Sequence, residues 1–436
     1  MSEKSALRDA EERLALFPRF GAKPGLDAVA ALLDAVGNPH EKLKFVHVAG
    51  TNGKGSTTAM IASALDFAGY RTGMFTSPSV EKITERVCIG TEPVADEIFA
   101  NACARVMDAA AGIPDRVCTQ SDVLTAAAFL IFFEEGCEAV VAEVGLGGRL
   151  DATNIIPSPE VSVITSVSLD HTAQLGGSIA EIAAEKCGII KPRRPAVSFC
   201  RQPAEAAEVI AKQAEMNGSE LFVPDTDKLE ISSLSPEGSV FCYCGVRYET
   251  KMPGRHFVLN ALTAIETLKV MARSGWNISE KDIARGVSAR PLTGRLQTIG
   301  ADPRILIDGA HNPDAAQRLC ETVRELFPNR RIVTVMGMFS DKDFKSCISK
   351  VADISDVFIA AQPAGERALD AAEAAEIACG RAGFTGICRS PVRALGTAVR
   401  FAGKNDVILC CGSFALLASV KAAAEKYGGR VPEFPK

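Results

Sequence analysis

Short apolar runs rich in Val and Ile alternate along this chain with longer, Ala-rich stretches of helical character. The apolar runs predict strands at Lys44–Ala49, Ala139–Glu143, Val161–Thr165, Arg304–Asp308, Ile332–Met336, Asp356–Ala360 and Asp406–Cys410. Helices are predicted between them, for example at Ser56–Ala68, Asp122–Glu134, Asp314–Leu326 and Phe414–Ala424. This alternation indicates parallel sheets connected by crossover helices. One β-rich insertion, roughly Lys228–Thr250, interrupts it.

The segment Arg290–Arg295, with the sequence RPLTGR, separates two series of strand–helix units. Its Pro and Gly suit a linker, and a chain of 436 residues is long enough for two or three domains. We therefore predict a large domain over residues 1–295 and a smaller one over residues 296–436. The expected fold class is α/β, with a mainly parallel, P-loop-type sheet in the first domain and a Rossmann-like second domain.

The composition excludes several classes of protein. A formal net charge of −5 and a pI near 5.8 give no basic surface for nucleic acid or for an anionic membrane. The 14 cysteines contain no Cys-x-x-Cys pair, so we expect reduced thiols in a cytoplasmic protein. The longest apolar stretch, around Ala126–Phe133, is too short to span a bilayer, and the N-terminus lacks the apolar core of a signal peptide.

A Gly-rich segment, Gly50–Thr58, follows the predicted strand residues Val46–Ala49 directly and leads into a helix. Glycines let backbone N–H groups face an anion, the helix N-terminus adds partial positive charge, and Lys54 can neutralise phosphate oxygens. The hydroxyl of Ser56 or of Thr57 can serve Mg²⁺. The spacing departs from G-x-x-x-x-G-K-[ST], because the first Gly is missing and Gly55 follows the lysine. A turn that binds nothing is the alternative, but the strand and the lysine favour binding of a nucleotide phosphate.

Polar residues in the first domain suggest further chemistry without deciding it. Glu143 ends an apolar strand, where a carboxylate would stand beside the phosphate loop and could serve Mg²⁺. From this segment alone, a charge that marks the strand's exit into solvent is the simpler interpretation. His171 follows the next strand and could be a metal ligand, although a lone His more often packs or caps. Lys186, next to Glu185 on a helix, locally indicates a solvated surface ion pair.

The second domain repeats the pattern of a strand that ends in polar groups. Asp308 ends a strand, where it could accept hydrogen bonds from ribose hydroxyls, and His311 stands at the start of a helix. Polar clusters at strand ends in both domains predict a site in the cleft between them.

Taken together, these segments resemble the folylpolyglutamate synthase/dihydrofolate synthase family, a branch of the Mur-ligase-type, ATP-dependent amide ligases. The similarity runs from about Pro24 to Ser413, most of the chain. Its motifs are AGTNGKGS (49–56), FTSP (75–78), ERV (85–87), EVGLGGRLDATN (143–154), SLDHT (168–172), EKCGI (185–189), LTGR (292–295), DGAHNPDA (308–315), GMFSDKD (337–343) and CGSF (411–414). In that order the set is highly specific for the family.

The resemblance implies a ligase that joins L-glutamate to the carboxylate of a folate or of dihydropteroate. ATP, with Mg²⁺, would phosphorylate the acid, and the amine of glutamate would attack the acyl phosphate. By similarity, Gly53, Lys54, Gly55 and Ser56 hold the ATP phosphates, Asn260, Arg295 and Asp308 contact the nucleotide, Ser77, Glu143 and His171 bind Mg²⁺, Lys186 is carried as a carbamate, and His311 lies beside the nucleotide site. Lys54, Lys186 and His311 are the residues expected to be catalytic, and we expect a monomer.

The chain departs from the family's pattern at two places. Ser79 stands where the family has a His after Ser-Pro, and Gln120–Asp122 replaces a frequent Phe-Glu pair. Both places lie near the expected pterin pocket. They therefore bear on the preferred form of folate and not on the ligase chemistry.

Two other functions compete with this interpretation. A peptidoglycan-type Mur ligase would share the ATP machinery but resembles this chain with an extra N-terminal domain, for which the phosphate loop at Gly50 leaves no room. A P-loop ATPase without ligase activity would have no need of the DGAHNP and LTGR segments near the nucleotide. The sequence therefore favours the folate–glutamate ligase.

Overall fold

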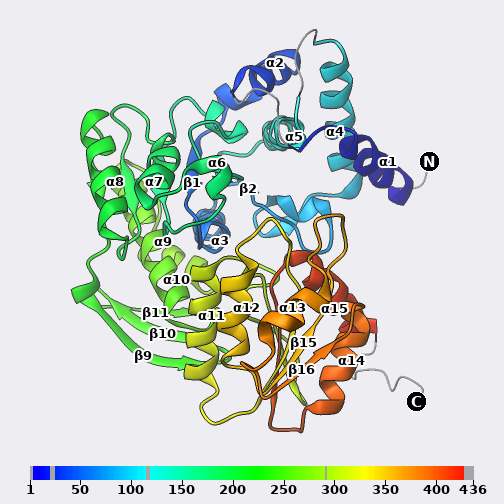
Figure 1. Ribbon diagram of the computed structural model, residues 1–436. Coiled ribbons are helices and arrows are strands. Elements are labelled where there is room, and N and C mark those ends of the chain that lie inside the picture. The colour runs from blue at the N-terminus through cyan, green and yellow to red at the C-terminus, as the bar shows by residue number, and fades with distance from the viewer. Residues whose placement is uncertain (1–2, 20–24, 114–117, 290–291, 427–436) are drawn as a thin grey trace.

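The computed structural model describes residues 3–19, 25–113, 118–289 and 292–426 and contains two α/β units (Figure 1). The N-terminal unit is built on an eight-stranded sheet of order β4-β3-β2-β5-β1-β6-β7-β8. Its strands are β1 Phe45–Ala49, β2 Thr72–Phe75, β3 Val87–Ile89, β4 Glu92–Pro93, β5 Ala139–Glu143, β6 Val161–Ile164, β7 Ala196–Ser198 and β8 Leu221–Phe222. The strands from β2 to β8 in this order are parallel, and β3 and β4 form an antiparallel edge.

Helices cover both faces of this sheet. One face carries α3 (Lys54–Phe67), α9 (Arg255–Arg273) and α10 (Glu280–Val287), and the other carries α1 (Glu3–Ala15), α2 (Asp27–Ala35), α4 (Asp96–Ala111) and α5 (Gln120–Glu134). Along β1, Val46 and Val48 pack toward the α3 side, whereas Phe45 packs against Phe129 of α5. Because both faces are covered, the central strands are continuous apolar runs.

Helix α10 lies directly on α3 at Gly286. A Cβ atom added to Gly286 would come within 2.6 Å of the Cα atom of Ala64. Only a residue without a side chain allows the two helices this approach. The phosphate-loop helix is therefore held in place by a segment far along the chain.

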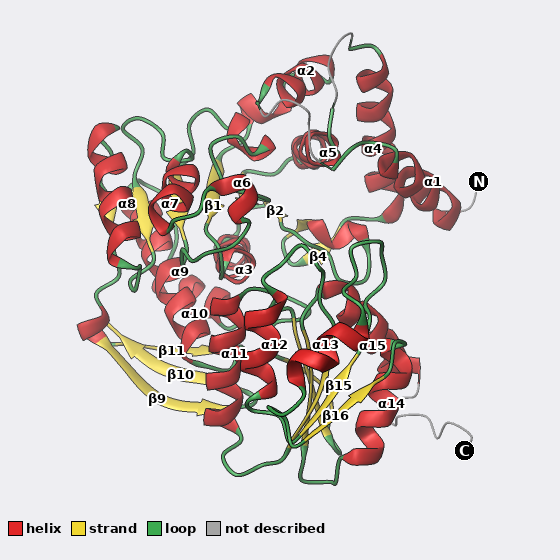
Figure 2. Cartoon of the chain, viewed as in Figure 1, coloured by secondary structure: helices red, strands yellow, loops and turns green. Residues whose placement is uncertain are grey.

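Two smaller groups of elements complete the N-terminal unit. Helices α6 (Thr172–Leu175), α7 (Ile179–Cys187) and α8 (Ala204–Met216) accompany β6 to β8. The antiparallel strands β9 (Leu229–Ser235), β10 (Gly238–Tyr243) and β11 (Val246–Thr250) form a separate sheet, which confirms the predicted β-rich insertion (Figure 2). Short 3₁₀ turns lie at Pro39–Lys42, Ile83–Arg86, Ala152–Ile155 and Thr226–Lys228.

The C-terminal unit has a six-stranded sheet of order β12-β13-β17-β14-β15-β16, parallel except for β12. Its strands are β12 Gln297–Gly300, β13 Arg304–Asp308, β14 Ile332–Met336, β15 Val357–Ala360, β16 Phe384–Ile387 and β17 Val407–Cys411. Its helices are α11 Pro313–Leu326, α12 Phe344–Ala352 and α13 Ala371–Ala378 on one face, and α14 Pro391–Phe401 and α15 Phe414–Lys426 on the other.

The structure confirms the predicted fold class, a two-unit α/β protein with mainly parallel sheets. Each predicted strand named above lies within one residue of the observed one, and the helix predicted from Ser56 begins two residues earlier, at Lys54. The exact domain boundary, between residues 295 and 296, stays a prediction. Within the described ranges, no helix is long and apolar enough to cross a membrane. All 14 cysteines are described, and all are free thiols.

Candidate functional site

A cavity of about 570 Å³ lies between the two units, at the carboxyl ends of β1, β5 and β6 on one side and of β13, β14 and β17 on the other. Its lining includes every site residue that the sequence suggested: Gly53, Lys54, Gly55, Ser56, Ser77, Glu143, His171, Lys186, Asn260, Arg295, Asp308 and His311. Carboxyl ends of parallel strands gather at one edge of a sheet, which brings these distant segments together.

The phosphate loop places Lys54 in the first turn of α3. Gly53 precedes the helix with a φ of +88°, and a Cβ atom there would lie 2.5 Å from Asn260 Oδ1. A glycine is therefore required both by the backbone and by the close approach of α9. The Nζ atom of Lys54 donates to the backbone oxygen of Thr51 at 3.3 Å and lies 3.9 Å from Glu143 Oε1. Burial lowers the pKa of Lys54, and the carboxylate of Glu143 partly opposes this shift.

Glu143 is buried in the cavity wall, so the interpretation of a strand-end charge in solvent is wrong. Its side chain is 2% exposed, and Oε2 accepts a hydrogen bond from the backbone N–H of Ser77 at 3.1 Å. Burial raises the pKa of this carboxyl group, and the nearby charges of Lys54 and Arg295 lower it again. The residue is covered because α3 and the loop after β2 close over the end of β5.

Lys186 is buried as well, which corrects the local interpretation of a surface ion pair. It is 4% exposed, and Nζ donates to the backbone oxygen of Gly50 at 2.9 Å. Glu185 instead pairs with Arg149 at 2.8 Å. The loop after β5 covers this part of α7 closely, since a Cβ atom on Gly148 would lie 2.7 Å from the backbone oxygen of Lys186. Burial, with the charge of Lys54 second, lowers the pKa of Lys186 to about 7.

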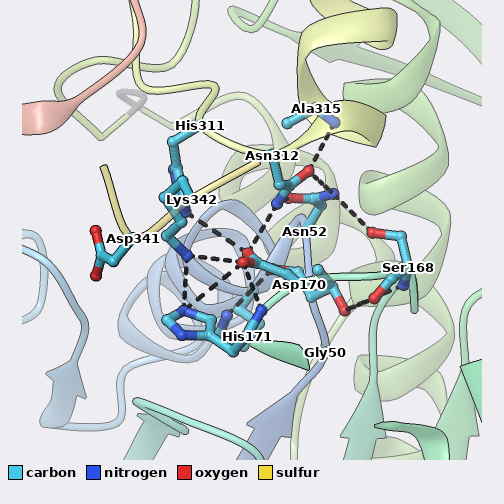
Figure 3. A network of polar contacts seen from close by, with 12 residues as sticks. Gly50, Asn52, Ser168, Asp170, His171, His311, Asn312, Ala315, Asp341 and Lys342 are labelled. Carbon is cyan, nitrogen blue, oxygen red and sulfur yellow. Dashed lines mark hydrogen bonds and ion pairs between the residues drawn. The ribbon is translucent and has the colours of Figure 1, made fainter. Parts of the chain in front are cut away.

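A polar network joins the two units across the cavity (Figure 3). Asp170 accepts from Lys342 Nζ at 2.7 Å and from Asn312 Nδ2 at 3.0 Å. Lys342 also lies 2.9 Å from His171 Nε2, and Asn312 donates to Asn52 Oδ1 of the phosphate loop at 2.9 Å. Sequence reasoning assigned no role to Asp170, Asn312 or Lys342. Their positions directly after strands or at a helix start were the only local signal.

His171 and His311, which line the cavity, are neutral near pH 7. Burial, followed by the charge of Lys342, lowers the pKa values of both residues to about 4. The Nδ1 atom of His311 donates to the backbone oxygen of Gly309 at 2.8 Å, because a carbonyl oxygen can only accept. The Nε2 atom of His311 therefore keeps its lone pair, and Asp170 lies 3.8 Å from it.

Asp308 connects the linker to the second sheet. Its carboxylate accepts from the backbone N–H groups of Leu296 and Ala310, both at 2.8 Å. Burial raises the pKa of Asp308, and the guanidinium of Arg295 opposes this shift. Arg295 itself lies over the ring of Phe414, 5.0 Å from its centroid. Asp308 thus holds the backbone that directly follows Arg295, and its predicted contact with ribose stays a prediction.

The described side chains of the cavity can supply only some of the ligands that a divalent cation needs. The described residues contain no group of three or more His, Cys, Asp and Glu side chains that could enclose a metal ion. Glu143 offers a buried carboxylate whose Oε1 atom lies 3.9 Å from Lys54 Nζ. This arrangement fits Mg²⁺, which is commonly held by one or two carboxylates together with substrate phosphates.

A second, smaller cavity of about 170 Å³ lies on the other side of Glu143. It is lined by Arg19, Phe75, Ser77, Arg86, Gln120, Ser121, Leu124, Thr125, Glu143, Gly145, Asp151 and Thr153. The Nε atom of Arg86 is buried there without a hydrogen-bond partner among the described residues. Asp122 does not line the cavity but caps α5, accepting from the N–H of Thr119 at 2.8 Å. Ser79 lines the main cavity instead.

The family relationship is visible along nearly the whole chain. Models of two Mur ligase domains match it, the middle domain over residues 48–268 and the glutamate ligase domain over residues 294–414. The dihydrofolate synthase/folylpolyglutamate synthase of Bacillus subtilis is 32% identical over 433 residues, covering 96% of this chain and 99% of that protein.

Solved structures of the same family are also similar to this chain. Escherichia coli FolC in complex with DHPP and ADP has a TM-score of 0.85 at 30% identity and covers 98% of this chain and 100% of its own. A bifunctional folylpolyglutamate synthase/dihydrofolate synthase with Mn, AMPPNP and L-glutamate bound has a TM-score of 0.83 at 30% identity, with 98% and 99% covered. The chain therefore belongs to the folylpolyglutamate synthase/dihydrofolate synthase family and is an ATP-dependent ligase of the Mur type.

Proposed function

We propose that this enzyme joins L-glutamate to the carboxylate of a folate, and of dihydropteroate, in the cavity between its two units. The observation that carries the proposal is the meeting of a phosphate loop from one unit with strand-end polar groups from the other in one cavity. Among its relatives, one solved structure holds DHPP with ADP and another holds Mn, AMPPNP and L-glutamate. We further propose domains at 1–295 and 296–436, a monomer and a cytoplasmic location.

The proposed reaction has two steps, and the cavity residues are assigned roles in each. A carboxylate is a poor electrophile, so its oxygen first attacks the γ-phosphorus of ATP, and ADP leaves. The amine nitrogen of glutamate then attacks the acyl carbon, phosphate leaves with the bonding electrons, and the amine loses a proton. We assign Gly53, Lys54, Gly55 and Ser56 to the ATP phosphates, and Asn260, Arg295 and Asp308 to the rest of the nucleotide. The positive charge of Lys54 stabilises the charge that develops on the transferred phosphoryl group.

His311 is assigned to the second step. Its Nε2 lone pair faces the cavity network and its Nδ1–H is fixed on Gly309, so the ring is held in the tautomer that accepts a proton at Nε2. A neutral imidazole in this position can take the proton that the attacking amine releases. Mg²⁺, held by Ser77, Glu143 and His171 with the phosphates, would neutralise phosphate charge when bound.

Release of ADP tests the function directly. Purified protein with ATP and L-glutamate is expected to release ADP with tetrahydrofolate or dihydropteroate and to remain near background with a Mur ligase precursor. Turnover with the Mur precursor alone, or ATP hydrolysis that needs no acceptor, would contradict the proposal.

Glu143→Gln is expected to lower the rate of Mg²⁺-dependent ADP release about 100-fold, because an amide of the same size lacks the negative charge that a hard cation needs. The melting temperature should change little, since the amide oxygen can still accept from Ser77 N–H. Glu138→Gln is the matched control, because Glu138 is exposed just before the opposite end of β5 and also accepts from a backbone N–H, that of Arg71. Equal Mg²⁺ titrations for Glu143→Gln and the natural enzyme would remove Glu143 from the metal site.

Ser79→His is expected to change KM for the folate substrate several-fold and KM for ATP much less. Ser79 lines the cavity in the loop that also carries Ser77, and this loop borders the smaller cavity, where we place the pterin. Gln120→Phe, at a residue that lines that smaller cavity, should affect KM for folate in the same selective way. Steady-state kinetics with tetrahydrofolate and dihydropteroate measure both effects. Identical substrate profiles for all three enzymes would place the pterin elsewhere.

A further inference from the structure

Lys342 makes the shortest polar contact between the two units in the network of Figure 3. It follows β14 of the C-terminal unit, and its side chain is 11% exposed. Its Nζ atom lies 2.7 Å from Asp170 Oδ1 and 2.9 Å from His171 Nε2. An ammonium group can only donate, so the ring nitrogen Nε2 of His171 gives its lone pair to Lys342.

The same lone pair is the one that a metal ion would need. A neutral imidazole has a single nitrogen lone pair in the ring plane, and the ring bonds a metal or accepts a hydrogen bond through it, but not both. The ammonium charge would also repel a cation placed at hydrogen-bond distance from His171. Lys342 and a divalent cation therefore compete for one atom.

Asp170 can keep Lys342 paired when its bond to His171 is broken. Its carboxylate accepts from Lys342 and from Asn312 Nδ2, and it also accepts from the backbone N–H of His171 at 2.8 Å. Loss of the bond to His171 therefore leaves the lysine paired and the carboxylate satisfied. The bond between Asn312 and Asn52 is independent of this exchange. The competition can be resolved by a movement of the Lys342 side chain while the units remain in contact.

We propose that Lys342 is a tethered cation that occupies His171 in the metal-free enzyme and is displaced from it by a divalent cation. The inference rests on the proposed role of His171 as a metal ligand and adds a positioning residue from the opposite unit. Metal binding thereby breaks one specific contact between the units. The contact between Lys342 and His171 therefore lowers the affinity of the enzyme for the metal ion.

The test measures the affinity of the enzyme for Mn²⁺ in the absence of nucleotide, with electron paramagnetic resonance as the readout. Lys342→Met should bind Mn²⁺ about tenfold more tightly than the natural enzyme, the order expected when one competing charge-assisted hydrogen bond is lost. Lys345→Met is the matched control. Lys345 is exposed in the first turn of α12, and its substitution removes the same charge as Lys342→Met. Lys345→Met should leave the affinity unchanged. Equal affinities of the natural enzyme and Lys342→Met, or no detectable binding by Lys342→Met at millimolar Mn²⁺, would overturn the proposal.

A double-mutant cycle with His171→Asn separates competition from a general charge effect. If Lys342 acts through the lone pair of His171, Lys342→Met should give no gain in the His171→Asn background. A gain of equal size there would show a charge effect only and would overturn the proposal. Lys342→Gln, whose amide can still donate to Asp170, replaces Lys342→Met if the latter does not fold. ADP release by the natural enzyme tests the ligase function independently, so the two failures are distinguishable.

Discussion

Lys186→Ala is expected to lower the rate of the ligase step roughly a thousandfold, the loss that follows removal of a charged group from a buried reaction site. We propose that this lysine acts as a carbamate. The nitrogen lone pair of a neutral amine attacks CO₂, a proton is released, and the product carries a negative charge with two oxygens. A pKa of about 7 for Lys186 makes the neutral amine abundant at physiological pH, which an ordinary exposed lysine does not allow.

The experiment measures ADP release with and without added small carboxylates, which should partly restore Lys186→Ala by supplying the missing oxygens. Lys186→Arg keeps the positive charge but cannot form a carbamate, so it should be as inactive as the Ala variant. Lys191→Ala is the control, since Lys191 also donates to a backbone oxygen, that of Asn154, but does not line the cavity. Because protonation prevents carbamate formation, activity at low CO₂ should fall as the pH drops below about 7. Full activity of Lys186→Arg would refute the carbamate.

Lys54→Met is expected to reduce turnover about a thousandfold with no loss of thermal stability. Among the described residues of the free enzyme, the ammonium contacts only the Thr51 oxygen at 3.3 Å and Glu143 at 3.9 Å, and burial already disfavours its charge. Little folding energy is therefore lost with it, whereas a bound phosphate loses its nearest cation.

Melting curves, AMPPNP affinity and ADP release together check this expectation. Lys44→Met is the matched control. Lys44 directly precedes β1, at the end of that strand opposite to the phosphate loop, and it lies over the ring of Trp276. Lys44→Met should leave all three measurements near those of the natural enzyme. Natural turnover in a folded Lys54→Met enzyme would mean that the loop binds phosphate through its backbone alone.

The strands that carry the site could be predicted from sequence because both of their faces are buried. Uninterrupted apolar runs such as Ala139–Glu143 are typical of central parallel strands, and the polar residue at the end of each run marks the functional edge. The outer strands β3, β4 and β8 are only two or three residues long and carry no such pattern. Their existence depends on pairing with neighbours and not on their own residues.

Two contacts of the site could not be predicted from any single segment. The burial of Lys186 arises because the loop at Gly148 packs on α7, a contact between segments that are distant in the sequence. The contact of Lys342 with Asp170 spans 172 residues and crosses between the two units. Side-chain patterns within one segment report which face of that segment is covered, but they do not report what covers it.

The position of Gly286 against Ala64 has a consequence for biosynthesis. Helix α3 emerges from the ribosome about two hundred residues before α9 and α10, the helices that cover it. At typical translation rates of about 5–20 residues per second, its apolar face waits on the order of 10–40 seconds for these partners. During this interval the nascent chain presents an unprotected Ala-, Ile- and Leu-containing surface to chaperones. A transcript truncated before Arg255 should therefore yield an aggregation-prone polypeptide, although it would encode every strand of the first sheet.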